Sequence, residues 1–238
     1  MTDFELRERV RSSLYYHLAR LFELPGAFLE DERVLETLHV ALEAVNPAAA
    51  EHAAALRLAL AEEGLERVRR DHMRLFVGPE QLLAPPYGSV YLDAQRELLG
   101  PSTKAVERLY AEAGLRPADD LKDAPDHVRV ELDVMHLAVE RTLDAMHAGD
   151  WARAETLVRV QATLLQHHLS RWVTPFATLI RTGAGTAFYR RVAELLEAVV
   201  KQEFLEDAAA MIDEFNALKA EAATNATANA TTTEPATA

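Results

Sequence analysis

The stretch APPYGSVYLD, residues 84–93, decides the fold class of this chain, because it is the only segment in which a period of two extends over a useful length. Its two prolines fix φ and bias the preceding residues toward extended geometry, so the stretch is predicted to be extended and not helical. In an extended chain, Tyr87, Ser89 and Tyr91 share one face. One such stretch is too little for a sheet, and the fold class is therefore predicted to be all-α.

Helices are predicted on both sides of this stretch. The first covers residues 3–23, where apolar residues recur at helical spacing between a Thr2 or Asp3 cap and the stop Pro25-Gly26. The same pattern predicts helices at 30–44, 48–62, 64–76 after a break at Gly64, 102–113, 125–148, 151–168, 171–182 and 187–219. Pro175 is expected to interrupt or kink this series. Together these segments predict one globular domain of about ten helices over residues 1–220.

The composition excludes several classes of protein. Apolar residues make up 49% and charged residues 26% of the 238 residues, as in a soluble globular chain. The sequence has no Cys, which excludes disulfides, thiolate metal sites and a Cys nucleophile. The N-terminus has no apolar stretch typical of a secretory signal, and no run of about 18 apolar residues occurs. We therefore expect a cytoplasmic chain that does not insert stably into a membrane.

The net charge of −13 bears on the partner. Nucleic acids and anionic membranes are bound by basic surfaces, so neither is expected as a partner. An acidic chain instead attracts a cationic partner.

The last segment, EAATNATANATTTEPATA at 221–238, has no large apolar side chain. Such a segment cannot offset the entropy of ordering, so it is predicted to be a disordered tail. Asn225 and Asn229 each begin an N-x-T tripeptide, but glycosylation requires a secretory route that the N-terminus does not indicate.

Two segments are candidates for a functional site, the apolar proline-rich stretch at 84–93 and a polar segment at 122–137. The proline-rich stretch is unusually apolar for a linker, which fits either a packed connection or the wall of a groove. In KDAPDHVRVELDVMHL, residues 122–137, Asp123 is expected to cap a helix that has Pro125 at its first position and Asp126 and His127 in its first turn. The helix dipole should keep His127 neutral. This pair fits either a helix cap or the polar part of a site.

Four motifs in this order resemble the TorD/DmsD family of cytoplasmic chaperones for molybdenum-containing oxidoreductases. They are YYHLARLFELP at 15–25, DHMRLFVGPEQLLAPPYGSVYLD at 71–93, APDHVRVELDVMHL at 124–137 and HHLSRWVTPF at 167–176. Family members often have Trp near the Pro-Pro pair, where this chain has Tyr87.

The resemblance implies an all-helical protein without enzymatic activity. It would bind the twin-arginine leader, and sometimes the body, of an apo-enzyme of the dimethyl sulfoxide reductase superfamily, and it would delay export until the molybdenum cofactor is inserted. The family is known as a monomer or a domain-swapped dimer. Carried over to this sequence, the implied contact residues are Leu75, Phe76, Pro86, Tyr87, Ser89, Tyr91, Asp126 and His127.

Two alternatives compete with this reading. A helical bundle can hold two metals through Glu-x-x-His pairs, and that spacing occurs at Glu36/His39, Asp133/His136 and Asp144/His147 with Asp in two of the three cases. The chain can also be an acidic interaction scaffold without specificity for a leader. No cofactor is expected, since the sequence has no P-loop and RTGAGTAF at 181–188 is interpreted as a turn between helices, although some relatives bind GTP weakly.

Overall fold

The helices form a bundle in the computed structural model, which describes residues 2–31, 33–78, 82–94, 98–115, 123–202 and 208–232. Within these residues there is no strand, and the all-α prediction is confirmed. The helices are α1 Asp3–Arg20, α2 Phe28–Asp31, α3 Val34–Val45, α4 Pro47–Glu63, α5 Leu65–His72, α6 Ser89–Leu92, α7 Pro101–Glu112, α8 Val128–His147, α9 Trp151–Leu164, α10 Ser170–Gly183, α11 Ala187–Gln202 and α12 Ala208–Thr232.

Local sequence signals set several of these boundaries. Thr2 caps α1 in a reciprocal capping box with Glu5, in which each side chain accepts a hydrogen bond from the other residue's N–H. Asn46 caps α4 by accepting from the N–H of Ala49 at 3.0 Å. Gly64, with φ at 75°, separates α4 from α5 because a residue with a side chain is strained there. The predicted break at Gly64 is therefore confirmed.

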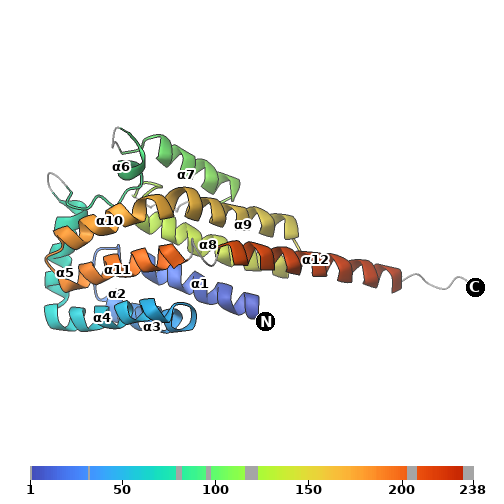
Figure 1. Ribbon diagram of the computed structural model, residues 1–238, viewed down its shortest axis with the longest axis horizontal. Coiled ribbons are helices and arrows are strands. Elements are labelled where there is room, and N and C mark those ends of the chain that lie inside the picture. Colours follow the sequence, from blue (N-terminus) through green and yellow to red (C-terminus); the bar gives the residue numbers. More distant parts are fainter. Residues whose placement is uncertain are drawn as a thin grey trace, which may run out of the picture.

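The long helices pack side by side in Figure 1, with α3 and α4 along one edge and α7 along the opposite edge. The most extensive contacts join α1 to α8, α8 to α9, α3 to α4 and α4 to α11. The interior contains several completely buried aromatic side chains, among them Tyr15, Trp172, Phe176, Phe188 and Tyr189. None of the described helices combines the length and the apolar character needed to cross a membrane.

The prediction for residues 84–93 is wrong in its second half. Only the residues up to Tyr87 are extended, and Ser89–Leu92 form the short helix α6. Likewise α8 begins at Val128, so Asp126 and His127 precede the helix and do not lie in its first turn. The physical reason is the same in both cases, because tertiary hydrogen bonds between these two segments override the local propensities on which the predictions rest.

Two five-residue turns of π-helix interrupt the regular helices. One, Met73–Val77, follows α5, and the other, Leu165–Leu169, joins α9 to α10 without a break. Pro175 lies inside α10, which continues through it. The proline therefore does not interrupt α10, and the second π-turn ends six residues before it.

The C-terminal helix α12 begins on the body of the protein and then extends beyond it (Figure 1). Met211 and Phe215 pack with Phe4, Leu143 and Val158 in a small second core. Residues 221–232 were expected to lack ordered structure, whereas the structure continues as helix through Thr232. Ala has the highest helix propensity, which explains a helix that has no apolar side to bury there. Residues 233–238 of the expected tail lie outside the described residues.

Candidate functional site

The proline-rich loop is fixed to the start of α8 by its backbone. The N–H of Val128 donates a hydrogen bond to the carbonyl of Pro86 at 2.8 Å. This hydrogen bond belongs to the one isolated β-bridge of the described residues, which is antiparallel and joins Tyr87 to His127. As a result the rings of Tyr87 and His127 lie edge to face, with their centroids 5.2 Å apart. Two motifs that are separate in the sequence thus form one surface.

The buried carboxylate of Asp126 shapes the end of this loop. Its Oδ2 accepts a hydrogen bond from the N–H of Ser89 at 2.7 Å, and neither side chain is exposed to solvent. This bond caps the first turn of α6 and is the reason why the chain turns helical after Gly88. Within the described residues, Asp126 Oδ1 and Ser89 Oγ have no hydrogen-bond partner.

A second buried polar group lies directly behind Gly88. Glu131 accepts hydrogen bonds from His168 Nδ1 at 2.9 Å and from Trp172 Nε1 at 3.3 Å. A Cβ on Gly88 would lie 3.1 Å from Trp172 Nε1 and 3.3 Å from Glu131 Oε1. The glycine is therefore required for the close approach of the loop to this network.

The charges of the Glu131–His168 pair follow from burial and hydrogen bonding. Burial raises the pKa of Glu131, with the hydrogen bond from His168 acting against it. Burial by itself lowers the pKa of His168. The hydrogen bond to Glu131 and the negative charge of Glu131 outweigh burial, so the pKa of His168 is raised. The other ring nitrogen of His168 faces the carbonyl of Ser102 at 3.3 Å, and two acceptors fit an imidazolium with two donors. The loop therefore packs on a charged, hydrogen-bonded pair.

A pocket of about 480 Å³ opens in front of the loop. Of the predicted contact residues, Phe76, Tyr87 and His127 line it. The remaining apolar and aromatic lining comes from Phe22, Leu24, His72, Val77 and Leu82. The polar lining is Glu23, Asp123 and Arg129. The pocket therefore combines an apolar wall with charged groups on one side, which suits a ligand that has both characters.

Carboxylates outnumber arginines on the charged side of the pocket. Arg129 lies 2.9 Å from Asp123, 3.4 Å from Glu23 and 3.7 Å from Asp133. Arg20 forms a further ion pair with Glu23. Burial raises the pKa of Asp133 to about 6, and Glu23 adds to the shift while Arg129 opposes it. Three carboxylates thus share two guanidinium groups, which leaves this side acidic.

The two histidines of the pocket are neutral near pH 7. Burial lowers the pKa of His72 to about 4, and His127 also contributes. Burial likewise lowers the pKa of His127 to about 4, against the opposing charge of Asp123. Its Nδ1 accepts a hydrogen bond from the N–H of Arg129 at 3.1 Å and so caps α8. A neutral His127 agrees with the prediction, but its main cause is burial and not the helix dipole.

The structure divides the eight predicted contact residues into a wall and its support. Leu75, Pro86, Ser89 and Asp126 are buried and do not line the pocket. Tyr91 is half-buried on another side of the loop, where it stacks on Trp172 with ring centroids 5.6 Å apart. The supporting residues hold the loop in place, whereas those on the wall are accessible from the pocket.

Several lining residues did not emerge from the sequence as candidates. Phe22 and Leu24 lie in the motif at 15–25, and His72 lies at the start of the motif at 71–93. Asp123 and Arg129 flank the Pro-Asp-His start of the third motif. Membership of these motifs was the available signal, but only packing shows which motif residues turn toward the pocket.

The three Glu/Asp-x-x-His pairs that suggested a metal site have other partners. Glu36 pairs with Arg33, and His39 Nδ1 donates a hydrogen bond to the carbonyl of Ala50 at 3.1 Å. Asp133 faces Arg129, and His136 contacts Ser12. In the third pair, Asp144/His147, the ring nitrogen Nε2 of His147 lies 2.8 Å from Glu5 Oε1. Across the described ranges, no three His, Asp or Glu side chains gather in a way that could hold a metal ion.

Comparisons with known proteins agree on one group of relatives. The sequence model described as nitrate reductase delta subunit matches residues 42–178. The Tat proofreading chaperone DmsD of Salmonella typhimurium is 27% identical over 203 residues, which is 84% of this chain and 88% of that protein. The chaperone protein TorD of Vibrio parahaemolyticus is 26% identical over 186 residues, which is 78% of this chain and 80% of that protein.

A solved structure shares the fold. The crystal structure of a protein described as a redox enzyme maturation protein from Archaeoglobus fulgidus superposes with a TM-score of 0.50 at 17% identity. The superposition covers 82% of this chain and 94% of the Archaeoglobus chain. The sequence relatives are named as chaperones and not as enzymes, and the resemblance to the TorD/DmsD family is confirmed.

Proposed function

The chain belongs to the nitrate reductase delta subunit family, and we propose that it is a cytoplasmic chaperone for the maturation of a redox enzyme. Its client is the precursor of a molybdenum-cofactor oxidoreductase of the dimethyl sulfoxide reductase superfamily. It binds the twin-arginine leader of this precursor, or its apo form, and delays export until the cofactor is inserted.

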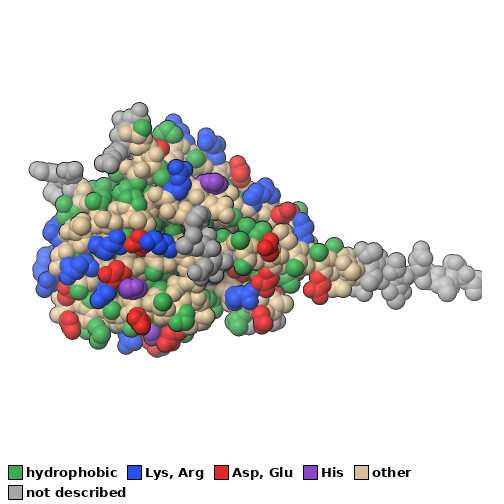
Figure 2. Space-filling view, in the orientation of Figure 1, with side chains coloured by type: hydrophobic (Ala, Val, Ile, Leu, Met, Phe, Trp, Pro, Cys, Tyr) green, Lys and Arg blue, Asp and Glu red, His purple; other side chains and the backbone are tan. Residues whose placement is uncertain are grey.

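The observation that carries this proposal is the pocket beside the proline-rich loop. Its apolar wall contains Phe76 and Tyr87, and Leu24 and Val77 at its edge are 41% and 50% exposed. Exposed apolar side chains around a pocket are typical of a surface that binds a peptide. In Figure 2 hydrophobic side chains also gather over α6 and α10, near the end of the molecule at which the loop lies. The apolar part of a leader fits this wall.

The acidic side of the pocket supports recognition of arginine. Asp123 and Glu23 already hold the guanidinium of Arg129. A carboxylate is the usual partner of a guanidinium, because its two oxygens can accept two parallel hydrogen bonds from the planar group. An arginine of the leader can therefore share or take over these carboxylates, while its apolar stretch packs against Tyr87.

The buried residues of the loop serve the same site indirectly. Asp126 and the Glu131 network fix the loop from behind, so Tyr87 keeps its position beside His127. A preformed wall lowers the entropy lost when the peptide binds. We therefore assign Phe76, Tyr87 and His127 to contact with the leader, and Asp126 to positioning of the loop.

The experiment that tests this proposal is calorimetric binding of synthetic leaders from the molybdoenzymes encoded in the same genome. Each leader is paired with a control in which both arginines are replaced by glutamine. Saturable binding to one leader, weakened by about tenfold or more in its control, supports the proposal and names the client.

The same experiment separates the proposal from its alternative. If the glutamine control binds as tightly as the leader, the site recognises apolar segments without regard to arginine, as expected of a general scaffold. If no leader binds, the pocket is not a leader site.

A further inference from the structure

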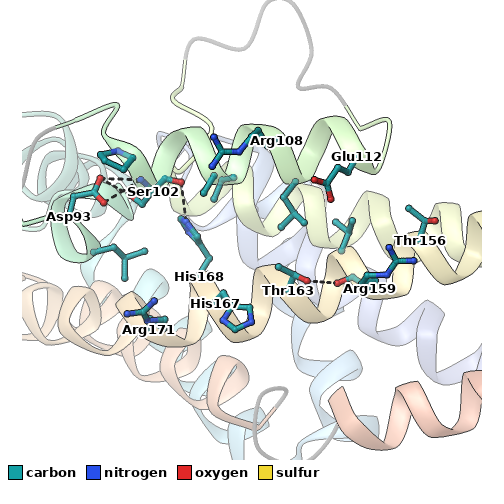
Figure 3. A pocket seen from close by; sticks show the side chains of 16 residues that line it. Asp93, Ser102, Arg108, Glu112, Thr156, Arg159, Thr163, His167, His168 and Arg171 are labelled. Atoms are coloured by element: carbon teal, nitrogen blue, oxygen red, sulfur yellow. Dashed lines mark hydrogen bonds between the residues drawn. The ribbon is translucent and has the colours of Figure 1, made fainter.

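A second groove lies on a different part of the protein, between α7 and α9 (Figure 3). Its volume is about 520 Å³, and it shares no lining residue with the pocket beside Tyr87. Apolar side chains of Leu92, Val106, Leu109 and Val160 form part of its lining. None of the residues assigned to contact with the leader lines this groove, although His168, which supports the loop through Glu131, does.

Three arginines surround the groove. Arg108 comes from α7, Arg159 from α9 and Arg171 from α10, and all three are exposed. Among the described residues, none of the three has an ion pair. Other exposed arginines of the described residues also lack an ion pair, namely Arg57, Arg69, Arg70, Arg141 and Arg190, so the distinguishing feature is that three such arginines surround one cavity. Figure 2 also shows Lys, Arg and His side chains on the surface over α7 and α9.

The two carboxylates that line the groove do not neutralise these arginines. Asp93 accepts hydrogen bonds from the N–H and the hydroxyl of Ser102, at 3.3 and 2.8 Å, and so caps α7. Glu112 lies at the other end of α7, where a negative charge is unfavourable for the helix dipole. The three arginines outnumber these two carboxylates and are not held in ion pairs within the described residues, and Arg159 also attracts Glu155 on the same helix.

The shape of the groove fits a helix. The residues contributed by α7 recur at helical spacing, from Ser102 through Ala105 and Leu109 to Glu112. Those on the opposite side recur in the same way, from Thr156 through Val160 and Thr163 to His167. A groove that follows α7 for its 12 residues is roughly 18 Å long, or about three helical turns. A helix of about 12 residues matches this length.

The second π-turn borders this groove. Within Leu165–Leu169, the ring of His168 turns inward to Glu131 and to the carbonyl of Ser102. The neighbouring residue His167 is exposed at the groove. Turns of this kind are rare within helices and frequently occur at functional sites. The first π-turn, Met73–Val77, borders the pocket beside Tyr87 in the same way. Each of the two cavities thus adjoins one of these turns.

We propose that the groove between α7 and α9 is a docking site for an acidic amphipathic helix of a partner protein. Its apolar residues pack on Leu109 and Val160, and its carboxylates pair with Arg108, Arg159 and Arg171. Helix-in-groove binding of this kind uses apolar anchors one turn apart, and charges on both sides of the anchors set its orientation. Because the two cavities share no residue, the protein can bind this helix and a leader at the same time.

The test uses the full chain and a fluorescently labelled peptide of about 12 residues, the length that fills the groove. The peptide has Leu along one face, Glu on both flanks of that face and Ala elsewhere. Two control peptides carry Lys in place of Glu, or the same residues with Leu distributed around the helix. We expect fluorescence anisotropy to show saturable binding of the first peptide only, weakening as salt is added.

Matched variants locate the binding. Arg108→Glu/Arg159→Glu is expected to weaken the Kd of the acidic peptide about tenfold or more, since like charges then face each other. Arg69→Glu/Arg70→Glu makes the same change in charge on α5, at two exposed residues that line neither cavity, and should leave the Kd unchanged. Circular dichroism verifies that both double variants are folded.

Three outcomes would overturn the proposal. If the Lys peptide binds with the same Kd as the Glu peptide, the groove does not recognise negative charge. If the peptide with distributed Leu binds with the same Kd, the apolar residues of the groove do not recognise an apolar helix face. If inorganic pyrophosphate displaces the Glu peptide, and its own Kd equals that of the peptide, the groove is a small-anion site and not a helix-docking site. Leader binding is measured on the same variants, so a failure of the proposed function is seen separately.

Discussion

The carboxylate of Asp126 accepts a hydrogen bond from the N–H of Ser89 at 2.7 Å, and this contact connects two motifs that lie 37 residues apart. Both residues are completely buried. The bond caps the turn at which the proline-rich loop becomes helical, and the loop carries Tyr87 to the wall of the pocket. A residue that cannot touch a ligand thus sets the position of one that can.

Replacing Asp126 should weaken both the fold and leader binding. In Asp126→Ala the buried N–H of Ser89 loses its acceptor, which typically costs about 1–3 kcal/mol. Asp126→Asn retains an amide oxygen that can accept the same bond, so most of the lost stability and affinity should return. Urea unfolding and leader calorimetry measure the two effects. Equal behaviour of both variants would show that the hydrogen bond does not position the loop.

Adding a single methyl group at Gly88 should displace the loop. The new Cβ would lie 3.1 Å from Trp172 Nε1 and 3.3 Å from Glu131 Oε1, and both belong to completely buried side chains that are hydrogen-bonded to each other. We expect Gly88→Ala to lower the free energy of unfolding by about 1–3 kcal/mol. Gly26→Ala is the matched control, because its nearest neighbour lies at 3.4 Å, an ordinary contact distance. A stable Gly88→Ala would argue against the tight packing of the loop.

Tyr87 should contribute to leader affinity without a large contribution to folding. It is half-buried at the pocket, and Tyr87→Ala removes an aromatic wall, so we expect affinity for the leader to fall about tenfold or more. Tyr16→Ala removes an exposed tyrosine on α1 that does not line the pocket, and it should leave the Kd unchanged. Calorimetry with the cognate leader compares the two variants. A similar Kd for both would remove Tyr87 from the contact residues.

Stability should fall on acidification between about pH 6.5 and pH 4. Burial lowers the pKa of His72 and of His127 to about 4, so over this interval the unfolded chain binds more protons than the folded one. Asp133, with its pKa raised to about 6, and Glu131, whose pKa burial also raises, act in the opposite direction, so the comparison with His72→Gln isolates the contribution of the histidine. Urea unfolding at several pH values should show less dependence on pH in His72→Gln than in the unmodified chain. An identical dependence would show that His72 is not buried as a neutral group.

The projecting end of α12 should add little to stability. The small second core that anchors this helix includes Met211, Phe215 and Leu218, and none of its members lies after residue 218. A chain ending at Ala220 should therefore unfold within about 0.5 kcal/mol of the full chain. The same chain tests whether the extension takes part in binding, since leader affinity is measured in parallel. A larger loss of stability would reveal packing of the extension.

The sequence alone determined the helical class and many of its boundaries, because those depend on short-range physics. Thr2, Asn46 and Gly64 act within one turn of their own position, and the apolar spacing of α1 or α8 is a property of neighbouring residues. The motifs also pointed to segments that line the pocket. Phe76, Tyr87 and His127, which line the pocket, were among the residues that the resemblance implied.

Only the tertiary structure decided which motif residues face the pocket and which support it. The helix Ser89–Leu92 forms because a carboxylate 37 residues away caps it, and no local pattern contains that information. The acidic side of the pocket likewise brings Glu23 from the end of α1 to Asp123 and Arg129. The groove between α7 and α9 exists because the two helices pack over a common core while three arginines stay outside it. Long-range packing fixes such relations, since hydrogen bonds and ion pairs depend on distances in space and not on separation along the chain.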